Sequence, residues 1–450
     1  SPILEPKPNI RLHRNTPEKL LDTIISMISR SQGAPFLLNF DERSIAGMIK
    51  EGVPEEEAWD YACVGCLENT LQGNDRSGTV NCNPNLTKSI ELTLWNGKNM
   101  PSNIVRDSIT NKPIAKNGEQ IGPESGEPEE FDTWEEFWNA WKKQIEYLIK
   151  YTVEINDKTE KLRAKFLPTP YLSTIVRGCI EKGLDIRKGG PEWSFVTIEG
   201  VGYATTVDSL LAIKEFVFDE KKYSISELKE VLNEDFEGKE GIIMQTFLKN
   251  KAPKYGNDER EADEIARKVM KTWADETWKY ETPTGFQYRP GMLSWNYWAG
   301  ADAGFTPATP EGRNSGTFMS NAICPSNGAD QKGPTAVTNS VGLALGGKTE
   351  DGGYVNYLPN GASHTITFNP SILVDPEHRE KFKAYLRGYI ENGGTCLQIN
   401  MLDVNMLRDA QKHPENYPNL LVRVTGYNAY FNAIGKELQD EIIARESHNI

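Results

Sequence analysis

The sequence predicts an α/β fold whose strands form a barrel or an open sheet. Short apolar runs, such as residues 36–40 and 365–368, alternate with longer segments whose apolar residues recur at helical spacing. Glycine, proline and asparagine separate these segments, and no internal repeat is evident. This alternation favours strands joined through helices and excludes an all-helical bundle or a sandwich.

The first third of the chain has clear helix signals. Thr16 and Pro17 are typical of a helix start, and Asp132 is expected to cap a long helix with a tryptophan stripe. Such a stripe packs in a core far more often than it holds a cofactor. The polar segment 99–130 is expected to be a long surface loop. Helices are expected from Pro17 to Gly33, at 43–50, from Pro54, at 84–95 and from Asp132, with a strand at 36–40.

In the remainder of the chain, expected strands alternate with expected helices. Residues 168–180 are expected as a strand or short helix, and the Gly/Ser/Thr-rich stretch 302–340 as ordered loops. The highly charged helix 258–277 is predicted to be amphipathic and to lie on the surface. The other helices are expected at 204–217, 224–233, 375–391 and 403–411. Strands are expected within 189–202 and at 288–296, 354–358, 365–368 and 395–400.

Composition excludes several classes of function. The 450 residues include 64 acidic and 50 basic side chains, for a net charge of -14, and no dense basic run. A nucleic acid partner is therefore not expected. No apolar run is long enough for a bilayer and no signal-peptide pattern opens the chain, so we expect a soluble cytoplasmic protein that acts on a small molecule.

The cysteines and histidines do not form a recognisable metal site. Six cysteines are too sparse for a disulfide framework, and the single C-x-x-C at Cys63–Cys66 has no second pair for zinc. Five scattered histidines lack metal-ligand spacing, so no bound metal is expected in this chain. Phosphate-binding and dinucleotide-binding glycine motifs are also missing.

A glycine near the C-terminus organises the remaining signals. Gly426 follows a short apolar strand and precedes an aromatic-rich turn, in the segment RVTGYNAYF. Most such glycines are turn residues. Here, however, five segments in order resemble those of the glycyl radical enzymes of the pyruvate formate-lyase-like superfamily, over about the whole chain. They are Gly65-Cys66-Leu67-Glu68, residues 200–214, residues 325–335 with Cys324 in place of a serine, residues 408–415, and residues 423–431.

The resemblance implies a particular architecture and set of partners. The family fold is a ten-stranded β/α barrel with surrounding helices, and this chain resembles its C-terminal half. It divides into a barrel region with the cysteine loop, 1–325, and a glycyl radical domain, 326–450. We therefore expect the N-terminal half to come from the same precursor or a separate chain, a homodimer or hetero-oligomer, and a radical S-adenosylmethionine (SAM) activating enzyme that installs the radical.

The resemblance also assigns roles. Gly426 stores the radical, because amide donation and carbonyl withdrawal stabilise an unpaired electron on its α-carbon. Cys66 relays it by hydrogen-atom exchange, for which an apolar setting suits a thiol. Glu68, two residues on and on the same face of an extended chain, is the acid or base, with its pKa expected to be raised by burial. Cys63 is the alternative thiol, and a small buried hydrophobe is the plain alternative for Cys66.

The expected reaction depends on Glu199, which stands before Gly200-Val201-Gly202. In the arylacetate decarboxylase branch a glutamate in this neighbourhood binds the substrate ring, and Asn69 replaces the proline usual in eliminases. We therefore expect decarboxylation of an arylacetic acid of the 4-hydroxyphenylacetate or indoleacetate type; a phenol-holding histidine is not seen at 94–100. The alternatives are an eliminase (diol, choline, hydroxyproline or isethionate type), a purely structural Glu199, and a non-enzymatic repair protein, which would lack Cys66 and Glu68.

Overall fold

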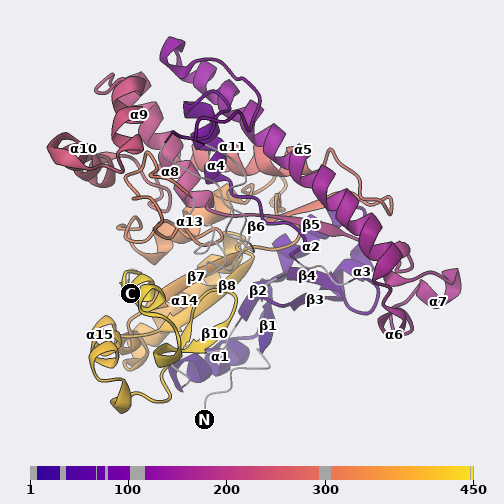
Figure 1. Ribbon diagram of the computed structural model, residues 1–450. Coiled ribbons are helices and arrows are strands. Elements are labelled where there is room, and N and C mark those ends of the chain that lie inside the picture. Colours follow the sequence, from indigo (N-terminus) through magenta and orange to yellow (C-terminus); the bar gives the residue numbers. More distant parts are fainter. Residues whose placement is uncertain are drawn as a thin grey trace.

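The computed structural model describes residues 8–30, 37–66, 68–76, 80–101, 117–292, 306–445 and 447–448. Its fold is α/β, as the sequence predicts (Figure 1). Parts of several expected elements lie outside the described residues: Phe36, Gly33, residues 102–116 of the loop 99–130, residues 293–296 of the predicted strand and the beginning of the stretch 302–340.

The principal sheet joins the beginning of the chain to its end. Its strand order is β1-β2-β8-β7-β11, with β2 antiparallel to β8 and the other neighbours parallel. Figure 1 shows the early strands β1 and β2 beside the late strands β7 and β8. The bounds are β1 (Asn9–Leu12), β2 (Leu37–Phe40), β7 (Ser363–Phe368), β8 (Cys396–Met401) and β11 (Ser447–His448).

The two faces of this sheet differ in character because side chains alternate along a strand. Leu397, Ile399 and Met401 of β8 share a buried apolar cluster with residues of α1 (Glu18–Arg30) and α14 (Pro376–Glu391). Cys396, Gln398 and Asn400 of the same strand therefore project from the opposite face, and all three are buried. The site described below is built on that second face.

A larger core lies among the remaining helices. It joins α4, α5, α8, α11 and α13 to the two-stranded parallel sheet of β5 and β6. These bounds are α4 (Thr87–Leu94), α5 (Trp134–Phe166), β5 (Val196–Gly200), α8 (Tyr203–Ile213), α11 (Arg260–Thr277), β6 (Tyr288–Met292) and α13 (Pro334–Ala344). The others are α2 (Asp41–Lys50), α3 (Glu55–Trp59), β3 (Tyr61–Val64), β4 (Glu68–Leu71), α6 (Pro170–Ser173), α7 (Cys179–Lys182), α9 (Ile225–Asn233), α10 (Gly238–Lys251), α15 (Val404–Lys412), β9 (Leu421–Arg423), β10 (Asn428–Tyr430) and α16 (Lys436–Ile443).

Several local predictions need correction. The long helix α5 is capped by Thr133, not Asp132, because the Thr133 hydroxyl accepts from the Glu136 amide in a capping box. The predicted strand 354–358 is a loop with a single bridge. Within the expected loop 302–340, Pro334 instead begins α13, since proline fits the first turn of a helix.

Helix α11 is amphipathic, as predicted, and one of its faces is exposed. The other face is buried, including Ala266, Met270 and Trp273, and it packs against α8 and α13. Most of the charged residues lie on the exposed face, but Asp263 and Glu276 are buried. The charge content did not reveal these two buried acids.

Candidate functional site

The cysteine loop is the turn of a β-hairpin. Strands β3 and β4 pair from Tyr61↔Leu71 to Val64↔Glu68, so Gly65 and Cys66 lie at the turn. Gly65 has φ of 58°, which favours glycine. A Cβ there would also lie 2.6 Å from Glu68 Oε2, so the glycine leaves room for that carboxylate.

Glu68 lies beside Cys66, but by a different route from the one predicted. Its side chain does not share a face with Cys66 on an extended strand; Oε2 reaches back across the turn and accepts a hydrogen bond from the Cys66 amide at 2.9 Å. Glu68 is buried, with 5% of its surface exposed. Cys66 is half-buried and packs against the cluster of Leu37 and Cys396, the apolar setting that the resemblance implies.

Cys63, the alternative thiol, has a different environment. It lies within β3, where Asn39 Nδ2 donates to its sulfur and its Sγ donates to Asn69 Oδ1 at 3.4 Å. Burial raises the pKa of Cys63 to about 12. Cys63 is thus held within a strand by amide partners, whereas Cys66 lies at the turn of the hairpin.

The glycine loop is a second hairpin. Strands β9 and β10 pair antiparallel, and Gly426 lies between them, buried, with φ of 68°. Asn400 holds the incoming strand by accepting from the Arg423 amide and donating to the Arg423 carbonyl, both at 2.9 Å. The positive φ means that a side chain at Gly426 would strain the backbone.

Gln398 joins the two loops. Its Nε2 donates to the Cys66 carbonyl at 3.1 Å, and its Oε1 accepts from the Gly426 amide at 3.2 Å. The structure therefore brings Cys66 and Gly426, which are distant in sequence, to opposite ends of one side-chain amide. Because Glu68 binds the Cys66 amide, three of the four predicted site residues meet at this point.

Glu199, the fourth predicted site residue, lies on β5. It is 2% exposed and accepts a hydrogen bond from Asn360 Nδ2. The Asn360 carbonyl in turn accepts from the Asn69 amide at 2.9 Å, next to Glu68. Burial, and then the charge of Glu68, raise the pKa of Glu199 well above its ordinary value. Gly291 of β6 is the register partner of Glu199, and a Cβ at Gly291 would come within 2.3 Å of the Glu199 carboxyl.

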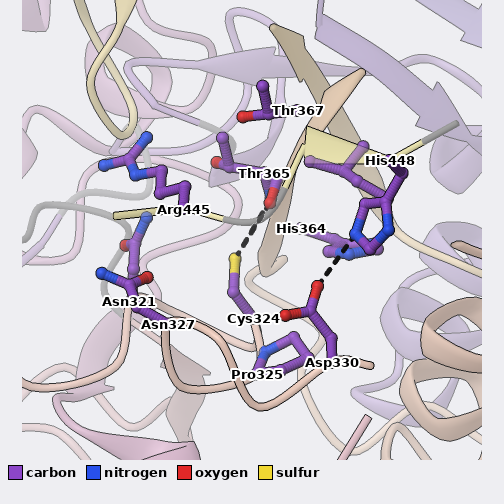
Figure 2. A pocket seen from close by; sticks show the side chains of 11 residues that line it. Asn321, Cys324, Pro325, Asn327, Asp330, His364, Thr365, Thr367, Arg445 and His448 are labelled. Carbon is purple, nitrogen blue, oxygen red and sulfur yellow. Dashed lines mark hydrogen bonds and ion pairs between the residues drawn. The ribbon is translucent and has the colours of Figure 1, made fainter. Parts of the chain in front are cut away.

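A small polar cavity of about 40 Å³ lies beside the glycine loop, on the site face of β7 (Figure 2). Asn321, in its wall, accepts from the Thr425 hydroxyl at 2.6 Å, and Arg445 donates to the Arg423 carbonyl at 3.1 Å. The C-terminal strand closes one side, where His448 pairs with Asp330 at 2.9 Å. The volume suits a few water molecules rather than an organic substrate.

The residues that sequence reasoning missed are the polar groups behind the loops: Gln398, Asn400, Asn360 and Arg423. The alternation in Leu397-Gln398-Ile399-Asn400 is a signal that could have revealed two of them, since two amides on one face of a buried strand need partners. Asn360 has no such signal, because it lies in a loop.

No group of three or more potential metal ligands occurs among the residues that the structure describes. Likewise, none of the helices seen in the described ranges is both long and apolar enough to cross a membrane.

The cysteine loop and the glycine loop, held together inside an α/β fold, indicate the class of protein. The family model described as "Pyruvate formate lyase-like" matches residues 1–300, and that described as "Glycine radical" matches residues 319–432. The chain belongs to the pyruvate formate lyase-like family of glycyl radical enzymes, and its cofactor is a glycyl radical.

The individual relatives are mainly dehydratases and lyases. The chain is 35% identical to trans-4-hydroxy-L-proline dehydratase of Clostridioides difficile, over 98% of this chain and 52% of that protein. It is 32% identical to an isethionate sulfite-lyase of Oleidesulfovibrio alaskensis, over 100% of this chain and 51% of that protein. The B12-independent glycerol dehydratase of Clostridium butyricum superposes with a TM-score of 0.87 at 34% identity, over 100% of this chain and 53% of that one. The chain thus spans about half the length of the relatives it matches.

Proposed function

We propose that the protein is a glycyl radical lyase of the eliminase type, which removes water or another small leaving group from a small polar substrate. The observation that carries this proposal is the Gln398 bridge, with Glu68 bound to the Cys66 amide. It places a candidate radical store, a thiol and a carboxyl group together. The dehydratase and lyase relatives supply the reaction type.

The radical relay follows from the chemistry of Gly426 and Cys66. The glycine radical takes the hydrogen atom of the Cys66 thiol, which leaves a normal glycine and a thiyl radical. The thiyl then takes a hydrogen atom from a substrate carbon adjacent to the carbon that bears the leaving group. After elimination, the product radical recovers a hydrogen atom from Cys66, so no electrons are gained or lost overall.

The elimination step needs a proton at the leaving group, and Glu68 is the proposed acid or base. A hydroxyl group departs as water when it takes that proton. Burial, and then the charge of Glu68, raise the pKa of Glu199, so Glu199 is the proposed proton donor beside Glu68. Two carboxyl groups with different environments are a suitable donor and acceptor set for such a step.

Arylacetate decarboxylation is the second candidate. The indoleacetate decarboxylase of Tractidigestivibacter scatoligenes is 28% identical over 100% of this chain, below the dehydratases. The feature that favoured it in the sequence was Glu199 as a ring-binding group. In the structure one Glu199 oxygen already accepts from Asn360, and the carboxyl group packs against Gly291. This packing supports a proton-holding role more than ring recognition.

The partners belong to the same proposal. A radical SAM activating enzyme is expected to install the radical on Gly426, and the substrate pocket is expected to be completed by a segment equivalent to the other half of the relatives. We retain the division into a barrel region, 1–325, and a glycyl radical domain, 326–450. The assembly is expected to be a homodimer or hetero-oligomer.

Electron paramagnetic resonance after anoxic activation tests the relay without knowledge of the substrate. The spin on Gly426 couples to its one remaining α-hydrogen and gives a doublet. In D₂O the Cys66 thiol exchanges its hydrogen, and reversible transfer then places deuterium on Gly426, so the doublet collapses. We expect no doublet in Gly426→Ala, a doublet that never collapses in Cys66→Ser, and normal collapse in Cys63→Ser.

A substrate panel then selects the reaction. Release of water from hydroxyproline or a diol, or of sulfite from isethionate, supports an eliminase, whereas carbon dioxide from indoleacetate supports the second candidate. A doublet that persists in Gly426→Ala would refute the assignment of the radical. Collapse at the normal rate in Cys66→Ser would transfer the relay to another thiol.

A further inference from the structure

We propose that Gln398 is a positioning residue that sets the geometry of hydrogen-atom transfer between Cys66 and Gly426. This inference rests on the proposed relay. Gln398 lies outside both loops, on the central strand β8, and its side chain is fully buried. Its amide acts as a spacer of fixed length between the two reacting residues.

The hydrogen bonds determine how this amide is oriented. Arg423 Nε, which can only donate, lies 2.8 Å from Gln398 Oε1. Thr365 Oγ1 lies 3.3 Å from the same oxygen, and the Gly426 amide 3.2 Å. The oxygen therefore faces the glycine loop, and the amide nitrogen faces the Cys66 carbonyl. If the amide were flipped, its NH₂ group would face two donors, Arg423 Nε and the Gly426 amide, and its oxygen would face the Cys66 carbonyl, which is an acceptor.

The backbone behind Gln398 is equally constrained. Strand β8 is paired on both sides, with Leu37 of β2 and Thr365 of β7 as the register partners of Gln398. Its apolar alternate residues are anchored in the core beneath α1 and α14. Neither the strand nor the amide is free to shift, so both loops are placed relative to a rigid element.

The neighbouring Asn400 shows what is specific to Gln398. Asn400 projects from the same face of β8, but it binds only the Arg423 backbone, that is, the glycine loop alone. Gln398 contacts both loops directly. The longer side chain therefore couples the cysteine loop to the glycine loop, whereas the shorter one anchors a single loop.

Such coupling has a kinetic consequence. Hydrogen-atom transfer requires the donor and acceptor close together, and a misplacement of about 1 Å costs roughly a hundredfold in rate. The Gln398 oxygen also polarises the Gly426 amide nitrogen toward the α-carbon, which stabilises an electron-poor radical. Loss of Gln398 should therefore slow transfer without preventing installation of the radical.

The test measures the D₂O-dependent collapse of the glycyl doublet in the activated holoenzyme. In Gln398→Leu, which retains neither hydrogen bond, we expect the doublet to form and to collapse at least about tenfold more slowly. In Gln398→Glu the ionised carboxylate still accepts from Gly426 but cannot donate to Cys66. At low pH the protonated acid recovers that donor, so collapse should accelerate as the pH falls from 8 to 5, relative to the wild type.

Gln144 provides the matched control, since it is a buried glutamine of α5 that donates to Pro123 and Ser125 far from both loops. Gln144→Glu should collapse at the wild-type rate. The proposal is overturned if both Gln398 variants collapse within twofold of the wild type, if Gln144→Glu is slowed equally, or if neither Gln398 variant forms a doublet. Failure of the relay itself is separate, because it would appear in the wild type.

Discussion

Replacement of Glu199 by glutamine tests whether this buried acid is neutral in the native protein. The side chain is 2% exposed, accepts from Asn360 and packs against Gly291. Burial first, and then the charge of Glu68, raise its pKa well above the ordinary 4.5. Glutamine has nearly the same shape and keeps the acceptor for Asn360, so Glu199→Gln imitates the protonated acid without its titration.

The magnitude follows from proton linkage. Between pH 4.5 and the raised pKa, the unfolded chain releases the Glu199 proton while the native state keeps it. Native stability therefore decreases as the pH rises through this window, by about 1.4 kcal/mol per pH unit. A chain of 450 residues unfolds with an entropy equivalent to about 1 kcal/mol per degree, so the difference is about 1–2 °C per pH unit.

Differential scanning calorimetry from pH 5 to 8 measures this effect. The Tm of the wild type should fall relative to that of Glu199→Gln as the pH rises, and the two curves should converge near pH 5. Parallel curves would refute a neutral Glu199. Glu51→Gln is the contrasting control, because it removes the 2.7 Å partner of buried Arg289. It should lower the free energy of unfolding by about 3–5 kcal/mol.

Two further changes test the packing around the site. His448→Ala removes the buried hydrogen bond between His448 and Asp330 and should cost about 1–3 kcal/mol, with faster hydrogen exchange confined to the C-terminal strand and the glycine loop. His413→Ala, at an exposed side chain near Glu415, should change stability by less than about 0.5 kcal/mol. Gly388→Ala fills open space within α14 and should stabilise by about 1 kcal/mol in calorimetry. Gly394→Ala should destabilise by about 3 kcal/mol or more, because its Cβ would lie 1.7 Å from the Tyr389 ring; equal Tm values for both would contradict this packing.

Much of the fold could be predicted because its signals are local. Asp375 with Pro376 predicted the start of α14, and the acidic first turn predicted α3, since capping and dipole interactions involve neighbouring residues. The mistakes occurred where local signals compete. Asp132 and Thr133 are both good caps, and only the reciprocal contact with Glu136 decides between them.

The candidate site divides in the same way. The sequence by itself predicted Cys66, Glu68 and Gly426 as candidates, because the segments around them resemble the two loops of a known family. It also predicted Glu199 as a candidate, but it gave no indication of how Glu199 packs. The neighbours of Glu199, Asn360 and Gly291, come from distant segments, and no local pattern links them.

Only the tertiary structure decided how the two loops meet. Strand β8 lies between β2 from the beginning of the chain and β7 from its last quarter, and this pairing places Gln398 between Cys66 and Gly426. A hydrogen bond between residues so distant in sequence depends on sheet register, which is set by cooperative packing of the whole core. The sequence therefore predicted which groups could react, and the sheet determined that they are held together.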